Sequence, residues 1–283
     1  MEVTRTGTGG MHNERAKQET KPWIRRMGRA GYMAQGVVYG LIGILAFMTA
    51  IGAGGEKTDS KGALQSLKNL PLGSVLLWLI GLGLIGYVIW SFVKAIKDPE
   101  NKGSDAKGIA TRIGYAISGI IYGSLAFTAI KTAVSSSGSG GSNEQSMSAQ
   151  MLSQPFGQWI IGIVGVITFG YGLYEIYSGW KEKFMSEFNI SDMKPGEVKT
   201  ARRSGKIGLI ARGIVLAMVG FFITQTAVTA DPGKTKGLDG ALSQLSNQPY
   251  GQWLLGAVSL GLILFGVYGI FRGRYMFMGY GGK

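Results

Sequence analysis

The chain has 283 residues, of which 46% are hydrophobic and only 16% are charged, and its formal net charge is +13. Soluble domains carry about a quarter charged residues, and a nucleic-acid-binding domain interleaves basic with aromatic side chains. Here Lys and Arg lie between apolar runs, so we expect no nucleic acid among the partners. There is no cysteine and one histidine, His12, which excludes disulfides, iron–sulfur clusters and bis-histidine haem; we expect no metal and no cofactor.

The first 28 residues form a polar, basic tail. They lack the apolar core and small-residue cleavage site of a signal peptide. We therefore expect residues 1–28 to stay on the protein as a cytoplasmic tail and the first apolar run to act as an anchor.

Six apolar runs follow, each close to the roughly 20 residues that cross about 30 Å of hydrocarbon. Polar residues do not recur in them at every third or fourth position, as they do in helices of soluble bundles. We predict an all-α integral membrane protein with six transmembrane helices in the lipid bilayer. The runs are residues 31–51, 73–95, 113–131, 156–178, 207–228 and 251–271.

Lys and Arg concentrate in the N-terminal tail, after the second and fourth runs, and in the C-terminal tail. Basic loops stay on the cytoplasmic side of a membrane. We therefore expect both termini in the cytoplasm, with Trp78, Trp159 and Trp253 in an outer aromatic belt.

The sequence contains three copies of one repeat unit. Gly31, Gly114 and Gly208 each lie two residues after a basic residue, at spacings of 83 and 94, and a later Pro-x-Gly motif recurs at spacings of 84 and 94. Agreement between two landmarks forty residues apart indicates a true tandem repeat. We expect each proline to open the second helix of its repeat, where the missing N–H costs little. The turn residues that define the repeats are Pro71 and Gly73, Pro155 and Gly157, and Pro249 and Gly251.

Each repeat contains two spans, so all three enter the membrane from the same side and are parallel. They can close into a bundle with pseudo-threefold symmetry. A central cavity follows only if small or polar side chains face the axis. The expected division is repeat 1 at 29–98, repeat 2 at 109–180, a cytoplasmic linker at 181–203, repeat 3 at 204–272 and a C-terminal tail at 273–283.

Small residues recur on one face of the first helix of each repeat. Offsets of three and four keep them on that face, and such faces let membrane helices pack closely. We interpret them as packing faces; the alternative is a ligand groove lined by exposed backbone. The residues are Gly36, Gly40 and Gly43, then Gly119 and Gly123, then Gly213, Ala217 and Gly220.

Ionisable residues inside spans are candidates for function. Glu175 and Arg212 lie at similar depths, so we expect them to pair or to face an aqueous vestibule, either as a structural pair or as part of a solute or proton path. Lys131, at the end of its span, can reach the interface. Gln35 and Ser118 occupy the positions equivalent to Arg212 and can line a pore or join helices.

The pattern R-x-G-Y-x-A-x-G-V-V-Y, followed by G-A-L-x-x-L and P-x-G-x-x-L-L-W, resembles the bacterial "domain of unknown function 1206" membrane family. In that family a two-helix unit occurs three times, so the resemblance covers roughly residues 23–272. It implies a bacterial cytoplasmic (inner) membrane protein. The family commonly has arginine where this chain has Gln35, Ser118 and Arg212, so only the third repeat keeps it. The resemblance implies no activity.

No arrangement typical of an enzyme emerges. The G-x-G-x-x-G match at 81–86 lies in the middle of a span with no preceding strand, which excludes a dinucleotide site. We see no carboxylate pair, nucleophile with a base, or metal cluster, and we expect neither a catalytic residue nor an enzyme.

Two functions stay open. The first is a non-enzymatic assembly or accessory subunit that packs with a second copy or with a membrane protein partner. The second is a channel or carrier for a small solute or ion along the pseudo-threefold axis. Polar residues converging on the axis favour transport, and an axis filled by Leu, Ile and Phe favours the assembly module. A third idea, sensing of the membrane surface by the basic tail, rests on charge alone.

Overall fold

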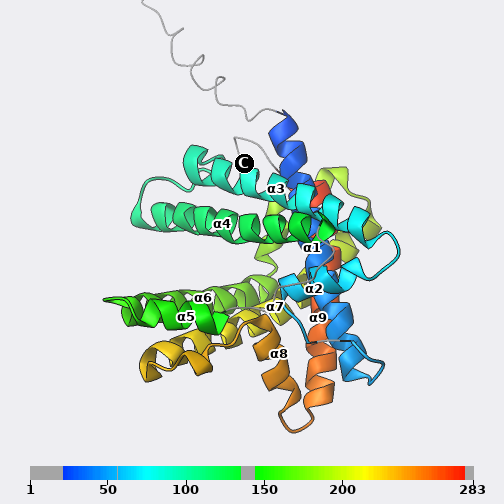
Figure 1. Ribbon diagram of the computed structural model, residues 1–283. Coiled ribbons are helices and arrows are strands. Elements are labelled where there is room, and N and C mark those ends of the chain that lie inside the picture. The colour runs from blue at the N-terminus through cyan, green and yellow to red at the C-terminus, as the bar shows by residue number, and fades with distance from the viewer. Residues whose placement is uncertain (1–21, 56, 135–143, 278–283) are drawn as a thin grey trace, which may run out of the picture.

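The computed structural model describes residues 22–55, 57–134 and 144–277 (Figure 1). His12, most of the expected N-terminal tail and the last residues of the C-terminal tail lie outside the described residues. The fold class is confirmed: the described chain is helical, and six helices are long and apolar enough to cross a membrane.

Each repeat consists of a long helix, a short helix and a second long helix. The first helix of each repeat begins earlier than predicted, because the helix includes the basic residues that precede its apolar run. In α7, for example, Pro195 occupies the first turn and Glu197 accepts a hydrogen bond from the backbone N–H of Lys194 at 2.8 Å. The long helices are α1 (Pro22–Ala50), α3 (Gly73–Lys97), α4 (Ala106–Val134), α6 (Gly157–Trp180), α7 (Pro195–Thr229) and α9 (Gly251–Tyr275), and the short ones are α2 (Ser60–Lys68), α5 (Glu144–Leu152) and α8 (Leu238–Ser246). The 3-10 turns are η2 (Lys183–Glu187), η3 (Ile190–Asp192) and η4 (Pro232–Lys234).

The Pro-x-Gly motif forms the same turn in all three repeats. The helix begins at the glycine and not at the proline, because the residue between them is left-handed: the φ angles of Leu72, Phe156 and Tyr250 are 63°, 64° and 61°. A Cβ at Gly73 would lie 2.2 Å from the carbonyl oxygen of Leu67. The glycine is therefore required where the second helix passes the end of the short helix.

The long helices pack in the order expected for a threefold cycle, with one interface missing. Each first helix packs against the second helix of the preceding repeat: α1 against α9, α4 against α3, and α7 against α6. Within a repeat, α1 packs against α3 and α7 against α9. Among the described residues, α4 and α6 have no comparable packing, and Figure 1 shows the α3–α4 pair apart from the α6–α7 pair. The expected cycle is therefore open within repeat 2.

The residues at the missing interface explain why it is open. In repeat 1, a Cβ at Gly83 would lie only 2.7 Å from the Cβ of Ala34, so α1 and α3 meet at two small residues. The equivalent residues in repeat 2 are Ile117 and Ile167, whose branched side chains prevent the same approach. Repeat 3 again uses small residues at these positions, Ala211 and Gly261.

Exposure confirms that these faces of α4 and α6 lack a neighbour. Tyr174 is 56% exposed, whereas its equivalents Trp90 and Tyr268 are each 1% exposed. A Cβ at Gly114 would meet nothing within 4 Å, whereas one at the equivalent Gly31 would lie 2.4 Å from the backbone nitrogen of Tyr87. We call these two faces the open interface; they comprise Gly114, Ile117 and Ile121 of α4 and Ile167, Gly170, Tyr171 and Tyr174 of α6.

Candidate functional site

Glu175 and Arg212 form an ion pair, one of the two arrangements expected for them, with Nη1 of Arg212 3.0 Å from Oε1 of Glu175. The two residues are 4% and 8% exposed. They meet because α6 and α7 cross at glycines: a Cβ at Gly172 would lie 2.7 Å from the carbonyl oxygen of Gly213. The side chain of Tyr171, one turn earlier on α6, also hydrogen-bonds to the carboxyl group of Glu175, whereas Nε of Arg212 is buried without a hydrogen-bond partner.

Aromatic rings surround the guanidinium of Arg212. Its Cζ lies 4.9 Å from the ring centroid of Tyr39 and 4.6 Å from that of Phe265, distances at which cation–π attraction acts. Tyr122 and Tyr171 also lie close enough to interact with it electrostatically. The arginine is thus held among α1, α4, α6 and α9.

Gln35, the repeat-1 equivalent of Arg212, joins the same region. Its side-chain amide donates a hydrogen bond to the hydroxyl of Tyr122, across the interior from α1 to α4. Ser118, the repeat-2 equivalent, is half-buried on α4 and takes part in none of these contacts. We call Gln35, Tyr39, Tyr122, Glu175 and Arg212 the central cluster.

The predicted small residues lie at helix interfaces. A Cβ at Gly36 would approach the carbonyl oxygen of Gly266 in α9 to 2.7 Å, and one at Gly220 would approach the backbone nitrogen of Phe169 in α6 to 2.3 Å. The predicted small residues of α4 lie farther from their neighbours in α3. Gly40 and Gly43 continue the α1 seam, Gly213 and Ala217 the α7 seam, and Gly119 and Gly123 face Phe92 and Val88 of α3.

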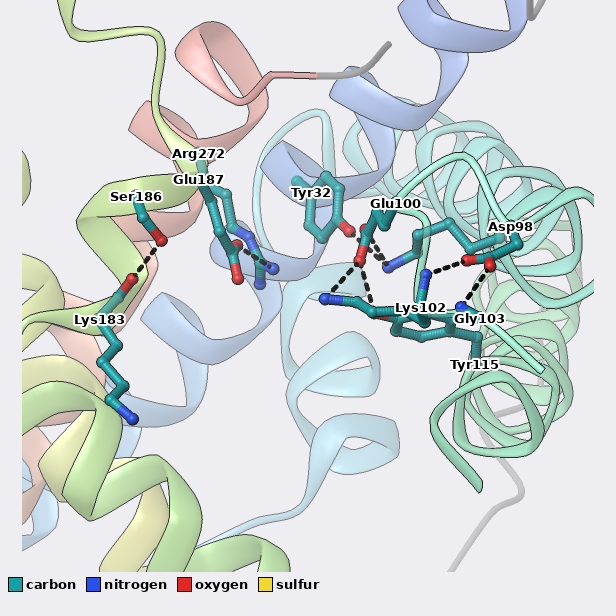
Figure 2. A network of polar contacts seen from close by, with 11 residues as sticks. Tyr32, Asp98, Glu100, Lys102, Gly103, Tyr115, Lys183, Ser186, Glu187 and Arg272 are labelled. Atoms are coloured by element: carbon teal, nitrogen blue, oxygen red, sulfur yellow. Dashed lines mark hydrogen bonds and ion pairs between the residues drawn. The ribbon is translucent and has the colours of Figure 1, made fainter. Parts of the chain in front are cut away.

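A second polar group, absent from the predicted site, lies where α1 and α4 begin and α3 ends (Figure 2). Lys94 is 4% exposed. Its ammonium donates to the hydroxyl of Tyr32 at 3.1 Å, lies 3.7 Å from Glu100, and stands 3.8 Å from the ring centroid of Tyr115. Tyr115 in turn donates to Glu100 at 2.7 Å.

Arg272 of α9 also contacts Tyr32. It pairs with Glu187 at 2.8 Å and stands over the ring of Tyr32, 4.5 Å from its centroid (Figure 2). One sequence signal was available, because Lys94 and Arg272 occupy equivalent positions in repeats 1 and 3. We call Tyr32, Lys94, Glu100, Tyr115, Glu187 and Arg272 the terminal network.

Glu100 lies in the segment between α3 and α4. Burial opposes its ionisation, but the charge of Lys94, the hydrogen bond from Tyr115 and the charge of Lys102 outweigh that effect and hold the pKa of Glu100 below its ordinary value. The glutamate is therefore an anion that neutralises the buried Lys94.

Tyrosine rings connect the terminal network to the central cluster. The ring centroids of Tyr32 and Tyr87 are 5.3 Å apart, and those of Tyr87 and Tyr122 are 4.6 Å apart. Polar and aromatic side chains thus run without interruption from the helix ends to the Glu175–Arg212 pair. Among the described residues, His, Asp and Glu form no group of three that could hold a metal ion.

Six apolar helices, three tandem two-helix repeats and a buried ion pair define a multi-pass α-helical membrane protein. The chain belongs to the family described as Domain of Unknown Function (DUF1206), whose model matches it three times, over residues 30–98, 113–182 and 207–276. It is 48% identical over 262 residues to "Uncharacterized protein YxxB" of Bacillus subtilis (strain 168), an alignment that covers 93% of this chain and 94% of the relative. No solved structure is significantly similar to it.

Proposed function

We propose that this protein is a non-enzymatic carrier for a small solute in the bacterial cytoplasmic membrane, with both termini in the cytoplasm. The central cluster is its binding position. The observation that supports this proposal is the convergence of polar side chains from α1, α4, α6 and α7, where an assembly module would place Leu, Ile and Phe.

The energetics of the ion pair favour a role beyond packing. Removing two charges from water costs several kcal/mol per ion, and apolar side chains of similar size often replace a buried pair without loss of stability. The repeat itself does not need the pair, because Gln35 and Ser118 stand for Arg212 in the other repeats, and Ser91 and Gly269 stand for Glu175. A costly pair that the architecture does not need is a candidate for function.

The open interface supplies the freedom of movement that a carrier needs. The α3–α4 pair and the α6–α7 pair are each tightly packed, and both connect to the α1–α9 pair. Rocking of one pair against the other would change access to the central cluster without breaking a helix interface.

Distance measurements test the proposal without knowledge of the solute. The chain has no cysteine, so Ile121→Cys with Ile167→Cys places two spin labels across the open interface in an otherwise unlabelled protein. A carrier is expected to give at least two distances in lipid nanodiscs, with proportions that change in Glu175→Gln. A second pair of labels, at Leu82→Cys and Leu260→Cys, is the control. These exposed positions of α3 and α9 report motions that do not involve the open interface. One narrow distance across α4 and α6, unchanged by Glu175→Gln, would contradict a carrier.

A second candidate is the assembly module. The apolar, exposed residues Ile117, Ile121 and Ile167 favour it, because a transmembrane helix of a second copy or of a membrane partner could complete the cycle there. A single narrow distance together with a stable oligomer in nanodiscs would favour this function.

A further inference from the structure

A cavity of about 200 Å³ lies between α5, α6 and α7. Its walls are largely apolar, with Met151 of α5, Ile161 of α6 and Ile223 of α7 among them. None of the described residues that line it belongs to the central cluster. An apolar cavity of about 150 Å³ takes up a molecule as large as benzene, so this one can hold several methylene groups of a chain.

The cavity follows from one residue of the short helix α5. Counting back from the Pro-x-Gly motif aligns Ser148 of α5 with Leu64 of α2 and Leu242 of α8. The two leucines are both 0% exposed, whereas Ser148 is 7% exposed and lines the cavity. Because a serine side chain is much smaller than a leucine side chain, the space that leucine fills in repeats 1 and 3 stays open in repeat 2.

The cavity opens toward the bilayer. Two residues of its lining, Met147 and Val164, are 60% and 46% exposed, so the space reaches the surface of the helices. Val164 follows Gly157, the first residue of α6, by about 10 Å along the helix axis. At that depth in an apolar span the surrounding medium is hydrocarbon, and an apolar cavity does not hold water well. Its occupant is therefore an apolar chain from the bilayer.

A cation stands beside this apolar space. Lys236, half-buried between η4 and α8, lines the cavity. Its ammonium donates to Oε1 of Gln244 at 2.7 Å and lies 4.7 Å from the ring centroid of Phe222. Both neighbours are neutral, and an ammonium has three donors. In the part of the chain that the structure describes, no carboxylate forms an ion pair with Lys236. The lysine can therefore accept an anion at the edge of the cavity.

We propose that this cavity binds one anionic phospholipid from the leaflet on the side of the short helices, with an acyl chain against Ser148 and Val164 and the phosphate on Lys236. A phospholipid carries both required groups, and its phosphate accepts charge-assisted hydrogen bonds from lysine. The site goes beyond the proposed carrier function and does not depend on it.

The bound lipid compensates for missing protein contacts of α5. The equivalent helix α2 packs against three long helices, α1, α3 and α4, whereas α5 packs chiefly against α6 and η4. An acyl chain between α5, α6 and α7 supplies part of the packing that the open cycle removes from this short helix.

Native mass spectrometry of the full chain, titrated with two lipids of identical chains, tests the head group. Dioleoyl phosphatidylglycerol is expected to bind one to one. Dioleoyl phosphatidylcholine adds a choline cation that Lys236 repels, so it is expected to bind about tenfold more weakly. Lys236→Gln is expected to remove this difference. Lys234→Gln is the matched control, because Lys234 is exposed and does not line the cavity. Equal binding of the two lipids by the parent chain, or equal losses in the two variants, would overturn the phosphate site.

Ser148→Leu tests the position of the acyl chain, since it restores the leucine of the other repeats. It is expected to raise the midpoint of thermal unfolding in lipid-free detergent, because it fills a cavity, and to weaken phosphatidylglycerol binding about tenfold. Ala149→Leu adds the same side chain at the exposed neighbouring residue and is expected to change neither quantity. If Ser148→Leu binds phosphatidylglycerol as tightly as the parent, the chain does not lie in this cavity. If it lowers the midpoint, α5 leaves no such space.

Oligomeric state in the same spectra separates the lipid from another occupant. A stable dimer that forms without lipid and excludes phosphatidylglycerol would place a second copy at the cavity and remove the assignment. One phospholipid on a monomer, together with a single spin-label distance, would keep the lipid site and remove the carrier.

Discussion

Alanine substitution at the three equivalent glycines Gly31, Gly114 and Gly208 tests the open interface directly. In Gly31→Ala the new Cβ would lie 2.4 Å from the backbone nitrogen of Tyr87, and in Gly208→Ala 2.5 Å from the Cα of Phe265. Backbone atoms cannot rotate away, so the helices must separate. Overpacking of this kind costs about 1–3 kcal/mol, more than the roughly 0.5–1 kcal/mol that alanine contributes to a helix interior.

Gly114→Ala is the matched control, because its Cβ would meet nothing within 4 Å. We expect this variant to be unchanged or stabilised by up to about 1 kcal/mol. Unfolding of the three purified variants in one detergent, followed by circular dichroism against temperature, ranks them. If Gly114→Ala loses as much stability as the other two, α4 and α6 are packed against each other in the membrane protein and the open interface does not exist.

Three further outcomes are expected. Gly36→Ala should lower the midpoint of thermal unfolding, because its Cβ would lie 2.7 Å from a carbonyl oxygen of α9, whereas Gly40→Ala, with its nearest neighbour at 3.9 Å, should not; equal midpoints would contradict the close seam. Glu175→Gln should destabilise by about 3–5 kcal/mol in chemical unfolding by leaving Arg212 unpaired, and Glu175→Gln with Arg212→Gln should recover part of that loss; a double variant no more stable than the single one would argue against pairing. The pKa of Glu100 is lowered in the folded protein, so its stabilising effect is fully present above its ordinary pKa and is lost as the pH falls through the lowered one. Thermal unfolding between neutral and acid pH should show that loss in the parent chain and a flatter profile in Glu100→Gln.

The features that the sequence predicted well depend on local composition or on spacing. The number and order of the spans follow from the apolar runs, and the three repeats follow from the positions of Gly31 and Pro71 relative to their equivalents. The Glu175–Arg212 contact was predictable because both residues lie at a defined depth in spans from the same side. The depth of a residue in the membrane follows from its distance, along the sequence, to the two ends of its apolar run.

The features that were missed depend on which side chains face each other across two helices. Ile117 and Ile167 are unremarkable as single residues in apolar runs, and they separate α4 from α6 only because both stand where repeat 1 has Ala34 and Gly83. Lys94 lies near the end of its predicted span, and its partners Tyr32 and Glu100 come from other segments. Such pairings become predictable only after the repeat is aligned and the helix neighbours are known.

The sequence differences between the repeats lie at the open interface and the neighbouring ion pair. Repeat 2 alone has the two isoleucines that open the cycle and alone has an acid at the position of Glu175, and repeat 3 alone has Arg212. A chain selected only for packing would gain nothing from placing its one central ion pair beside its one open interface. A binding protein needs both together, because a polar site in a membrane is useful only if a ligand can reach it. The proposed carrier function therefore accounts for an asymmetry that the threefold architecture leaves unexplained.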